Sequence, residues 1–401
     1  MKRLKIVADD KIPFLKGVLD SYADVVYLPG AKITAADVND ADAIFTRTRT
    51  KCNEALLKDS IVKLIATATI GFDHIDTGYC DAADIRWVNA PGCNSWSVQQ
   101  YITAAIVTLV KERSLKLSDL TLGVIGVGNV GSKVAWTAEM LGMRVLRNDP
   151  PRAERETGAT LTAPGENSAP ERVTLANEGE TAFIALDKLL TESDIVTCHT
   201  PLTKEGPYKT FHLASDDFFG KMKGGAVFVN TSRGPVTDTE ALKRAVRTGR
   251  ISEYILDVWE GEPNLDRDLL DGAFIGTPHI AGYSSDGKAN GTAACIHEFC
   301  KFFNLNILPD WYPGNIPAPP VSMEIPLDGR NKSNEQVFYE AITHTYPVRD
   351  DSNRLKNAPE TFEEQRGGYG VRREFKNFVI RAVNVGDDVV AALQGIGFRI
   401  A

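Results

Sequence analysis

The chain has few of the features that mark a secreted or membrane protein. Its six cysteines are scattered through 401 residues without a C-x-x-C pair, which suits reduced thiols in a cytoplasm better than a disulfide framework. No apolar run reaches the ~18 residues of a membrane span, so a membrane is not expected as a partner. The N-terminal segment turns acidic at Asp9 and Asp10 without a long apolar stretch, so no signal peptide is expected.

The chain also has fewer positively than negatively charged residues. Lys and Arg number 45 against 53 Asp and Glu, which gives a formal net charge of −8. Nucleic acid is therefore not expected as a partner, because neutralising its phosphates needs a basic face. The 43% hydrophobic and 24% charged content is typical of a globular protein, and the length allows two or three domains.

The most informative segment that is present is a glycine-rich turn between Gly123 and Gly131. An apolar strand runs into a G-x-G-x-x-G turn and then into a helix, whose N-terminus can bind a pyrophosphate. Gly126 allows the tight turn, Gly128 leaves room for the pyrophosphate, and Gly131 lets the helix pack on the strand. A second strand ends at Asp149, whose carboxylate would bind a ribose and repel a 2′-phosphate, so the expected cofactor is NAD.

Short apolar strands alternate with helical stretches, which predicts parallel sheets. A first group of strands is predicted at residues 4–7, 25–28, 43–46 and 64–67. A second group is predicted at residues 123–125, 144–148, 195–198, 226–230, 254–256 and 274–276. The long helix before the glycine-rich strand is expected to begin with a capping box formed by Ser97 and Gln100.

Three stretches depart from this alternation. Residues 152–181 lack an apolar period and are interpreted as a long surface loop. Residues 308–320 are a proline-rich linker, and the unit after it mixes a helix at 333–344 with a strand at 378–380. Because so short a unit leaves much apolar surface exposed, we expect it to form a symmetric homodimer.

Three residues at predicted strand ends have complementary chemistry: Arg233, Glu262 and His279. Arg233 can bind a carboxylate through two hydrogen bonds, Glu262 can orient an imidazole, and His279 can exchange a proton near neutral pH. Each residue alone is more often structural or solvated. Their convergence beside a dinucleotide motif, at the carboxyl edge of one sheet, favours catalysis. His199, also at a strand end, is interpreted as a cofactor contact.

A basic cluster follows the strand at residues 43–46, where Arg47, Arg49 and Lys51 alternate with threonines. Three cations among hydroxyls can hold a phosphate or a carboxylate. A basic loop exposed to solvent is an equally good interpretation. The polar turn that begins at Thr67 is a neighbour that could join this cluster.

These motifs resemble the D-isomer-specific 2-hydroxyacid dehydrogenases. The residues that carry the resemblance are 126–131, 149, 199–202, 231–234, 257–263 and 277–279. More narrowly, residues 90–94, 149–152, 205–210 and 279–284 resemble the members that oxidise 4-phospho-D-erythronate in pyridoxal phosphate synthesis. Residues 346–351 resemble the C-terminal dimerisation domain of those members.

The resemblance implies an α/β fold: a Rossmann-type doubly wound parallel sheet, a flavodoxin-like substrate domain and a C-terminal α+β dimerisation domain. The implied boundaries are residues 1–95 and 280–308 for the substrate domain, 96–279 for the NAD-binding domain, and 309–401 for the linker and dimerisation domain. Other 2-hydroxy acids, such as phosphoglycerate or glycerate, and an NAD-sensing co-repressor remain as alternatives.

The resemblance also implies the site residues, and it implies no metal ion. Arg233, Glu262 and His279 would be catalytic. Thr48, Thr69 and Tyr283 would bind substrate, with Arg47 and Arg49 as further candidates. The residues expected at NAD are Gly126, Gly128, Asn129, Val130, Gly131, Asp149, His199, Thr200, Pro201, Thr231, Ser232, Asp257 and Gly282.

Overall fold

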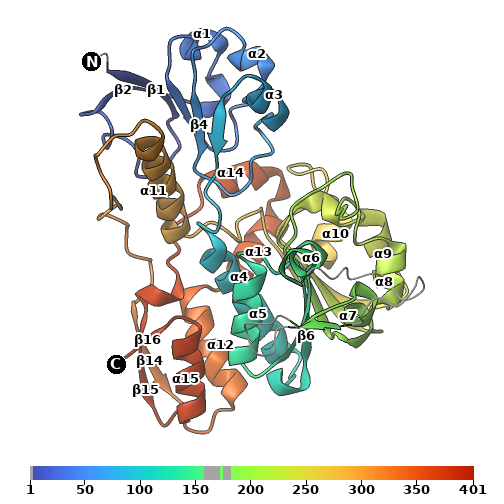
Figure 1. Ribbon diagram of the computed structural model, residues 1–401. Coiled ribbons are helices and arrows are strands. Elements are labelled where there is room, and N and C mark those ends of the chain that lie inside the picture. The colour runs from blue at the N-terminus through green and yellow to red at the C-terminus, as the bar shows by residue number, and fades with distance from the viewer. Residues whose placement is uncertain (1–2, 158–171, 175–181) are drawn as a thin grey trace. The chain divides into compact units, whose positions relative to one another are not determined.

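The computed structural model describes residues 3–157, 172–174 and 182–401, and the chain divides into two compact units (Figure 1). Unit 1 comprises Met1–Ser95 and Tyr283–Ala318, and unit 2 comprises Trp96–Gly282 and Pro319–Ala401. The chain passes from unit 1 to unit 2 after Ser95 and returns to unit 1 at Tyr283. Residues 319–401, expected to form a separate domain, pack with residues 96–282 in unit 2.

Unit 1 is built on a parallel sheet of five strands with the order β2-β1-β3-β4-β5. This 2-1-3-4-5 order is that of flavodoxin, as the resemblance implied. Every residue of β3 and β4 is buried, as expected for central parallel strands covered on both faces. The strands are β1 Leu4–Asp9, β2 Ala23–Leu28, β3 Ala43–Thr46, β4 Leu64–Thr67 and β5 Arg86–Val88. The helices are α1 Ala35–Val38, α2 Glu54–Leu57, α3 Thr77–Ala82 and α11 Ser285–Phe302.

Unit 2 contains an eight-stranded sheet with the order β13-β12-β11-β10-β6-β7-β9-β8. The chain starts at β6 and extends the sheet in both directions, so β6 and β10 flank the switch point where ligands bind in such sheets. All paired strands are parallel except β8 and β9. The strands are β6 Thr121–Ile125, β7 Arg144–Asn148, β8 Arg172–Thr174, β9 Ala182–Ile184, β10 Ile195–Cys198, β11 Ala226–Asn230, β12 Ile251–Leu256 and β13 Ile275–Gly276.

Helices cover both faces of this sheet. One buried cluster joins the sheet to α4 and α5, and a second joins it to the helices α7 to α10, which is the doubly wound arrangement. The helices are α4 Ser95–Glu112, α5 Gly131–Met140, α6 Pro150–Thr157, α7 Leu186–Glu192, α8 Asp216–Lys221, α9 Thr239–Arg247 and α10 Arg267–Gly272.

The C-terminal part of unit 2, expected to be α+β, has three parallel strands in the order β14-β15-β16, and helices connect them. The predicted helix at 333–344 is observed as α12, with Ser333 as its N-cap, and the predicted strand at 378–380 is observed as β15. The elements are β14 Glu324–Asp328, α12 Asn334–Thr345, α13 Val348–Asn357, α14 Phe362–Gly367, β15 Val379–Val383, α15 Asp387–Gly395 and β16 Arg399–Ile400.

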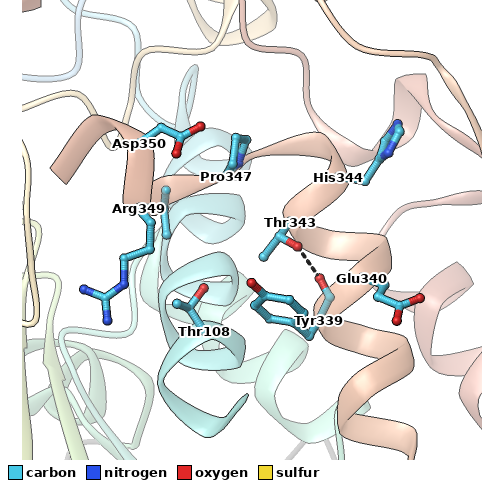
Figure 2. Close-up of a pocket in the computed structure, with 9 residues that line it drawn as sticks. Thr108, Tyr339, Glu340, Thr343, His344, Pro347, Arg349 and Asp350 are labelled. Carbon is cyan, nitrogen blue, oxygen red and sulfur yellow. Dashed lines mark hydrogen bonds between the residues drawn. The ribbon is translucent and has the colours of Figure 1, made fainter. Parts of the chain in front are cut away.

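A pocket of about 400 Å³ lies in unit 2 between α4, α12 and the start of α13 (Figure 2). Its lining includes Thr108, Tyr339, His344 and Arg349 but no residue predicted to bind NAD or substrate. Arg349 donates to Glu112 at 2.9 Å and stacks on Phe274 at 3.8 Å. The Arg349 guanidinium therefore has an anionic and an aromatic partner within unit 2.

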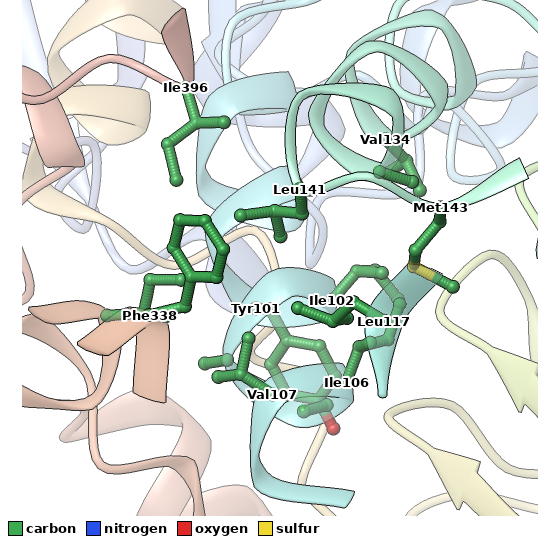
Figure 3. Close-up of a cluster of buried hydrophobic side chains, with 14 of the residues drawn as sticks. Tyr101, Ile102, Ile106, Val107, Leu117, Val134, Leu141, Met143, Phe338 and Ile396 are labelled. Carbon is green, nitrogen blue, oxygen red and sulfur yellow. The ribbon is translucent and has the colours of Figure 1, made fainter. Parts of the chain in front are cut away.

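The C-terminal part shares its hydrophobic core with residues 96–282 of the same unit (Figure 3). Tyr101 and Val107 of α4 pack in one buried cluster with Phe338 of α12 and Ile396, which follows α15. Much of the apolar surface expected to be covered by a second copy is thus already covered by α4 and α5 of the same chain.

The start of α4 differs from the prediction. The helix begins at Ser95, and Ser97 and Gln100 lie inside it, so the predicted capping box is wrong. The Ser97 hydroxyl donates to Glu374 at 3.1 Å, and the Gln100 amide donates to the Arg373 carbonyl at 2.9 Å. Ser97 and Gln100 therefore make buried polar contacts with the C-terminal part. Local sequence alone does not distinguish such contacts from a helix cap.

Part of the stretch predicted as a surface loop is regular structure. Asp149 caps α6, because its carboxylate accepts from the Arg152 amide at 3.0 Å, and Pro150 occupies the first helical position. The loop prediction is therefore wrong for residues 152–157 and 172–174, and residues 158–171 and 175–181 lie outside the described residues. Within the described part of the chain, no helix has the length and apolarity needed to cross a membrane.

Candidate functional site

The glycine-rich turn between β6 and α5 has the geometry that dinucleotide binding requires. Gly126 has φ +83°, and a Cβ there would lie 2.8 Å from the His199 carbonyl oxygen. A Cβ at Gly131 would lie 1.9 Å from the carbonyl oxygen of Gly126, so these two glycines are required by packing. A Cβ at Gly128 would meet nothing within 4 Å. The backbone at Gly128 therefore faces open space, where a pyrophosphate can approach.

Asp149 is held beside this turn. Its Oδ2 accepts from the Val127 amide at 2.8 Å, and its Oδ1 accepts from the Arg152 amide at 3.0 Å. Each oxygen keeps a second lone pair for a ribose hydroxyl. The Arg152 guanidinium is paired with Glu156 at 2.7 Å, so this neighbouring cation has an anionic partner already.

The ends of β10 and β11 supply a second set of polar groups near the turn. The hydroxyl oxygen of Thr200 is buried and has no hydrogen-bond partner within the described residues. A buried polar atom without a partner is costly, and a ligand that hydrogen-bonds to it removes that cost. Together with the open backbone at Gly128, this observation indicates that the residues present fit a bound dinucleotide.

His199 has a supporting place in this set. Its imidazole lies 3.0 Å from the Thr197 hydroxyl and 3.4 Å from the Thr231 hydroxyl. Burial lowers its pKa to about 3, so the ring is neutral. Both ring nitrogens are thus used by threonines of the same chain, and the ring orients Thr231. Ser232 is likewise fixed, since its amide and hydroxyl donate to Asn230 at 2.9 and 2.8 Å.

His279 and Glu262 form a close pair. The His279 Nδ1 lies 2.6 Å from the Glu262 Oε1, and the Trp259 amide donates to Oε2 of the same carboxylate at 3.3 Å. Burial alone would raise the pKa of Glu262, but the hydrogen bond and charge of His279, with the Arg366 guanidinium, lower it below its ordinary value. An ionised Glu262 orients the ring so that Nε2 is the nitrogen that can exchange a proton with a substrate.

Arg233 lies at the start of the 3-10 helix Gly234–Val236, directly after β11. Its guanidinium donates to the Ser232 carbonyl at 2.9 Å. A Cβ at Gly234 would lie 2.0 Å from the Trp259 carbonyl oxygen, so this loop is pressed against the segment that carries Glu262. Because β11, β12 and β13 are neighbours in the sheet, the three predicted catalytic residues follow adjacent strands.

Asp257 serves the loop that carries His279. It is 1% exposed, and its carboxylate accepts from the Thr277 hydroxyl at 2.6 Å and from the amides of Ile280 and Ala281, both at 2.8 Å. Burial raises its pKa. Asp257 was predicted at NAD; its Oδ1 accepts two of these hydrogen bonds and its Oδ2 accepts one.

A second histidine–carboxylate pair was missed by sequence reasoning. The His212 Nε2 lies 2.6 Å from the Glu260 Oε1, as close as the pair just described. Glu260 also accepts from the Thr239 amide at 3.0 Å, and the His212 ring stacks on Phe211 at 4.1 Å. No local pattern joins His212 to Glu260, which lies 48 positions away, so tertiary structure alone revealed the pair.

Of the residues expected to bind substrate, Arg47, Thr48 and Arg49 follow β3, Thr69 follows the neighbouring strand β4, and Tyr283 lies just before α11. Thr48 and Arg49 are exposed, and Thr69 is half-buried with its hydroxyl donating to the Gly71 carbonyl at 2.8 Å. The Arg47 guanidinium carbon lies 6.0 Å from the centre of the Tyr283 ring.

One cation near these residues was not predicted. The Lys288 ammonium lies 5.1 Å from the centre of the same Tyr283 ring that faces Arg47. Two cations therefore gather on one aromatic ring, which concentrates positive charge there. Because Lys288 lies in the first turn of α11, far in sequence from the basic cluster, no spacing could have linked the two.

The comparisons with known proteins place this chain beside one family of dehydrogenases. The family model described as D-isomer specific 2-hydroxyacid dehydrogenase, NAD binding domain, matches residues 97–281. Erythronate-4-phosphate dehydrogenase of Bacteroides thetaiotaomicron is 47% identical over 378 residues, which cover 94% of this chain and 99% of that protein. The enzyme of the same name from Porphyromonas gingivalis is 36% identical over 398 residues, with 98% and 100% covered.

Solved structures show the same architecture. D-lactate dehydrogenase from Aquifex aeolicus, complexed with NAD and lactic acid, matches with a TM-score of 0.60 and 29% identity, over 76% of this chain and 97% of its own. NAD+-bound 3-phosphoglycerate dehydrogenase from Entamoeba histolytica has the same fold, with a TM-score of 0.59 and 24% identity over 78% and 98% of the chains.

Proposed function

Since the chain belongs to the D-isomer specific 2-hydroxyacid dehydrogenase family, we propose that it oxidises 4-phospho-D-erythronate to 2-oxo-3-hydroxy-4-phosphobutanoate with NAD. This reaction is a step in the synthesis of pyridoxal 5′-phosphate. The observation that carries the chemistry is the 2.6 Å contact between His279 and Glu262, which provides an oriented base. The substrate follows from the relatives of that name, which match this chain over nearly its whole length.

In this proposal Arg233, Glu262 and His279, which follow β11, β12 and β13, have different roles in the reaction. Arg233 binds the substrate carboxylate through paired hydrogen bonds. His279 takes the proton of the C2 hydroxyl at Nε2, and the Glu262 carboxylate stabilises the imidazolium that forms. NAD, when bound, accepts the hydride from C2. The proton then leaves His279 for solvent, so one oxidation of the alcohol carbon balances one reduction of the cofactor.

The NAD-binding residues are proposed in two groups. The turn from Gly126 to Gly131, with Asn129 and Val130, would hold the pyrophosphate at the N-terminus of α5, and Asp149 would bind the ribose. The residues after the other strands would contact the rest of the cofactor through hydroxyls and backbone. This second group consists of Thr200, Pro201, Thr231, Ser232 and Gly282, with His199 and Asp257 acting through Thr231 and the 277–282 loop.

For the substrate we propose Thr48, Thr69 and Tyr283, with Arg47 and Arg49 as the phosphate ligands. These residues belong to a substrate domain, and residues 96–279 to an NAD-binding domain. All six cysteines lie among the described residues and none forms a disulfide there, which supports a place in the reducing cytoplasm.

The test is a substrate panel with NAD. We expect 4-phosphoerythronate to give NADH with a kcat/KM at least roughly tenfold above those of erythronate, glycerate and 3-phosphoglycerate, equal to about 1.4 kcal/mol in the transition state. Faster turnover of glycerate or 3-phosphoglycerate would assign a different substrate. Binding of NAD without turnover of any hydroxy acid would favour a co-repressor.

Asp149 is expected to set the choice of NAD over NADP, because its carboxylate repels a 2′-phosphate. Asp149→Ser should lower the ratio of kcat/KM for NAD to that for NADP by roughly tenfold or more. Steady-state rates with both cofactors measure this ratio. Asp268→Ser, which removes an exposed acid of α10, is the matched control and should leave it unchanged. Equal use of the two cofactors by the unsubstituted protein would contradict the assignment.

A homodimer formed by the linker and dimerisation segment, residues 309–401, is also proposed. A parallel sheet is normally covered on both faces, and the β14–β15–β16 sheet has α12 and α15 against one of them. Val383 on β15 is 57% exposed, and strand alternation places it on the face opposite the buried Ile325 and Ile380. A second copy related by a two-fold axis would cover this surface.

The dimer is best tested by substitution, because removing residues 317–401 would expose the core shared with α4. Val383→Asp should be monomeric by light scattering, while Ile61→Asp, at a similarly exposed site of unit 1, should remain a dimer. If Val383→Asp kept the mass of a dimer, another surface would be responsible.

A further inference from the structure

The loop that carries His279 is bound on both sides of its backbone. His279 itself has φ +59°, a left-handed conformation that a non-glycine residue adopts only when its surroundings impose it. On one side Asp257 accepts hydrogen bonds from the amides of Ile280 and Ala281. The carbonyl groups of the same two residues have a partner of the opposite charge.

That partner is Arg372, which precedes β15 by seven residues in the C-terminal part of unit 2. Its Nη2 donates to the Ile280 carbonyl at 3.1 Å and to the Ala281 carbonyl at 2.5 Å. The side chain is buried, with only 3% of the residue exposed. A buried anion therefore binds the amides of Ile280 and Ala281, and a buried cation binds the carbonyl groups of the same two residues.

The guanidinium is itself held in place by aromatic rings. It lies 4.3 Å from the centre of the Tyr346 ring and 5.8 Å from that of Tyr369. Both tyrosine hydroxyls donate to the carboxylate of Asp351 on α13, at 2.9 and 2.7 Å. This packing restricts where the donors of Arg372 can point.

We propose that Arg372 is a positioning residue of the reaction, which fixes the 277–282 loop and thereby the imidazole of His279. Without it, two buried carbonyl groups lose their donor and Asp257 holds the loop from one side alone. The loop can then leave the left-handed conformation at His279, and the distance from Nε2 to the reacting hydroxyl is no longer set. This inference rests on the proposed role of His279 as the base.

The experiment compares Arg372→Met with Arg354→Met. Arg354 also pairs with Asp351, at 2.8 Å, but its side chain is 55% exposed and it is not a ligand of Ile280 or Ala281. We expect kcat of Arg372→Met to fall at least roughly tenfold below that of Arg354→Met, with a smaller change in KM for the hydroxy acid. Arg372→Lys, which keeps the charge and a donor, should recover part of kcat.

A second measurement reports on the loop without any substrate. In protein labelled with 13C-histidine, the ring signal of His279, identified by its absence in His279→Gln, should be single and sharp in the unsubstituted protein. It should broaden or split in Arg372→Met and stay unchanged in Arg354→Met. If 4-phosphoerythronate were not the substrate, this spectroscopic result would still stand.

Two outcomes would overturn the proposal: a folded Arg372→Met with kcat within threefold of the control, or a His279 signal that Arg372→Met leaves unchanged. If Arg372→Met fails to fold, Arg372→Lys is measured in its place, and a kcat and ring signal equal to those of Arg354→Met overturn the proposal in the same way.

Discussion

His279→Ala is expected to lower kcat by about 10²–10⁴-fold, the size typical of general acid–base catalysis. The reason is that the hydroxyl proton has to leave as the hydride transfers, and His279 is the ring oriented by an ionised carboxylate at 2.6 Å. KM for the hydroxy acid should change less, because Arg233 still binds the carboxylate. Initial rates at saturating NAD and substrate measure the effect.

The structure supplies a matched control in the pair His212 and Glu260, which has the same 2.6 Å separation. His212→Ala removes an equivalent histidine–carboxylate contact and should keep kcat within a few-fold. If His212→Ala were inactive and His279→Ala nearly normal, the two pairs would exchange roles, and the assignment made from the sequence would be wrong.

Glu262→Gln provides a finer comparison at the same site. The glutamine keeps a hydrogen bond to the ring but removes the negative charge that stabilises imidazolium. The lowered pKa of Glu262 means that the carboxylate is charged near neutral pH. The variant should therefore lose less kcat than His279→Ala, and its acidic limb of kcat/KM should move to lower pH. An unchanged limb would show that Glu262 only holds the ring in place.

The second large effect is expected at the phosphate. Arg47→Ala should raise KM for 4-phosphoerythronate by roughly tenfold to a hundredfold, because a hydrogen bond to a charged group contributes about 1.5–3 kcal/mol. Arg49→Ala should act in the same direction. Turnover of unphosphorylated erythronate should hardly change in either variant, so the ratio of the two KM values is the quantity to measure.

The control for this series is Arg86→Ala, which removes an exposed arginine at the opposite end of the unit 1 sheet, where β5 begins. It should leave both KM values unchanged. Equal losses on erythronate and 4-phosphoerythronate in Arg47→Ala would mean that Arg47 supports the fold or the carboxylate. The phosphate ligand would then be sought at Lys288, which faces the same Tyr283 ring.

Much of the fold was readable from short stretches of sequence. The strands at residues 43–46, 64–67, 144–148, 195–198 and 226–230 have the bounds predicted for them, because buried parallel strands are nearly continuous apolar runs. The glycine-rich turn was equally clear, since a positive φ and a close approach of two backbones leave few residue types but glycine. Parallel topology then placed Arg233, Glu262 and His279 at one edge of a sheet.

Other features depended on residues far apart in the chain. Ser97 and Gln100 imitate a capping box although their partners lie in the C-terminal part, and Asp149 starts a helix where a loop was expected. Helix caps and buried polar contacts use the same side chains, so spacing alone does not separate them.

The surroundings of His279 show most directly the difference between what local sequence predicts and what tertiary packing decides. Local sequence is enough to propose a histidine as a base at a strand end, because strand periodicity and residue chemistry are properties of a few neighbouring positions. Three residues from elsewhere in unit 2 complete these surroundings. Glu262 contacts the ring, Asp257 accepts hydrogen bonds from amides of the loop, and Arg372 donates to carbonyl groups of the loop. The packing of all of unit 2 decides which charged residues reach this loop. A charge is buried only where hydrogen bonds and opposite charges surround it.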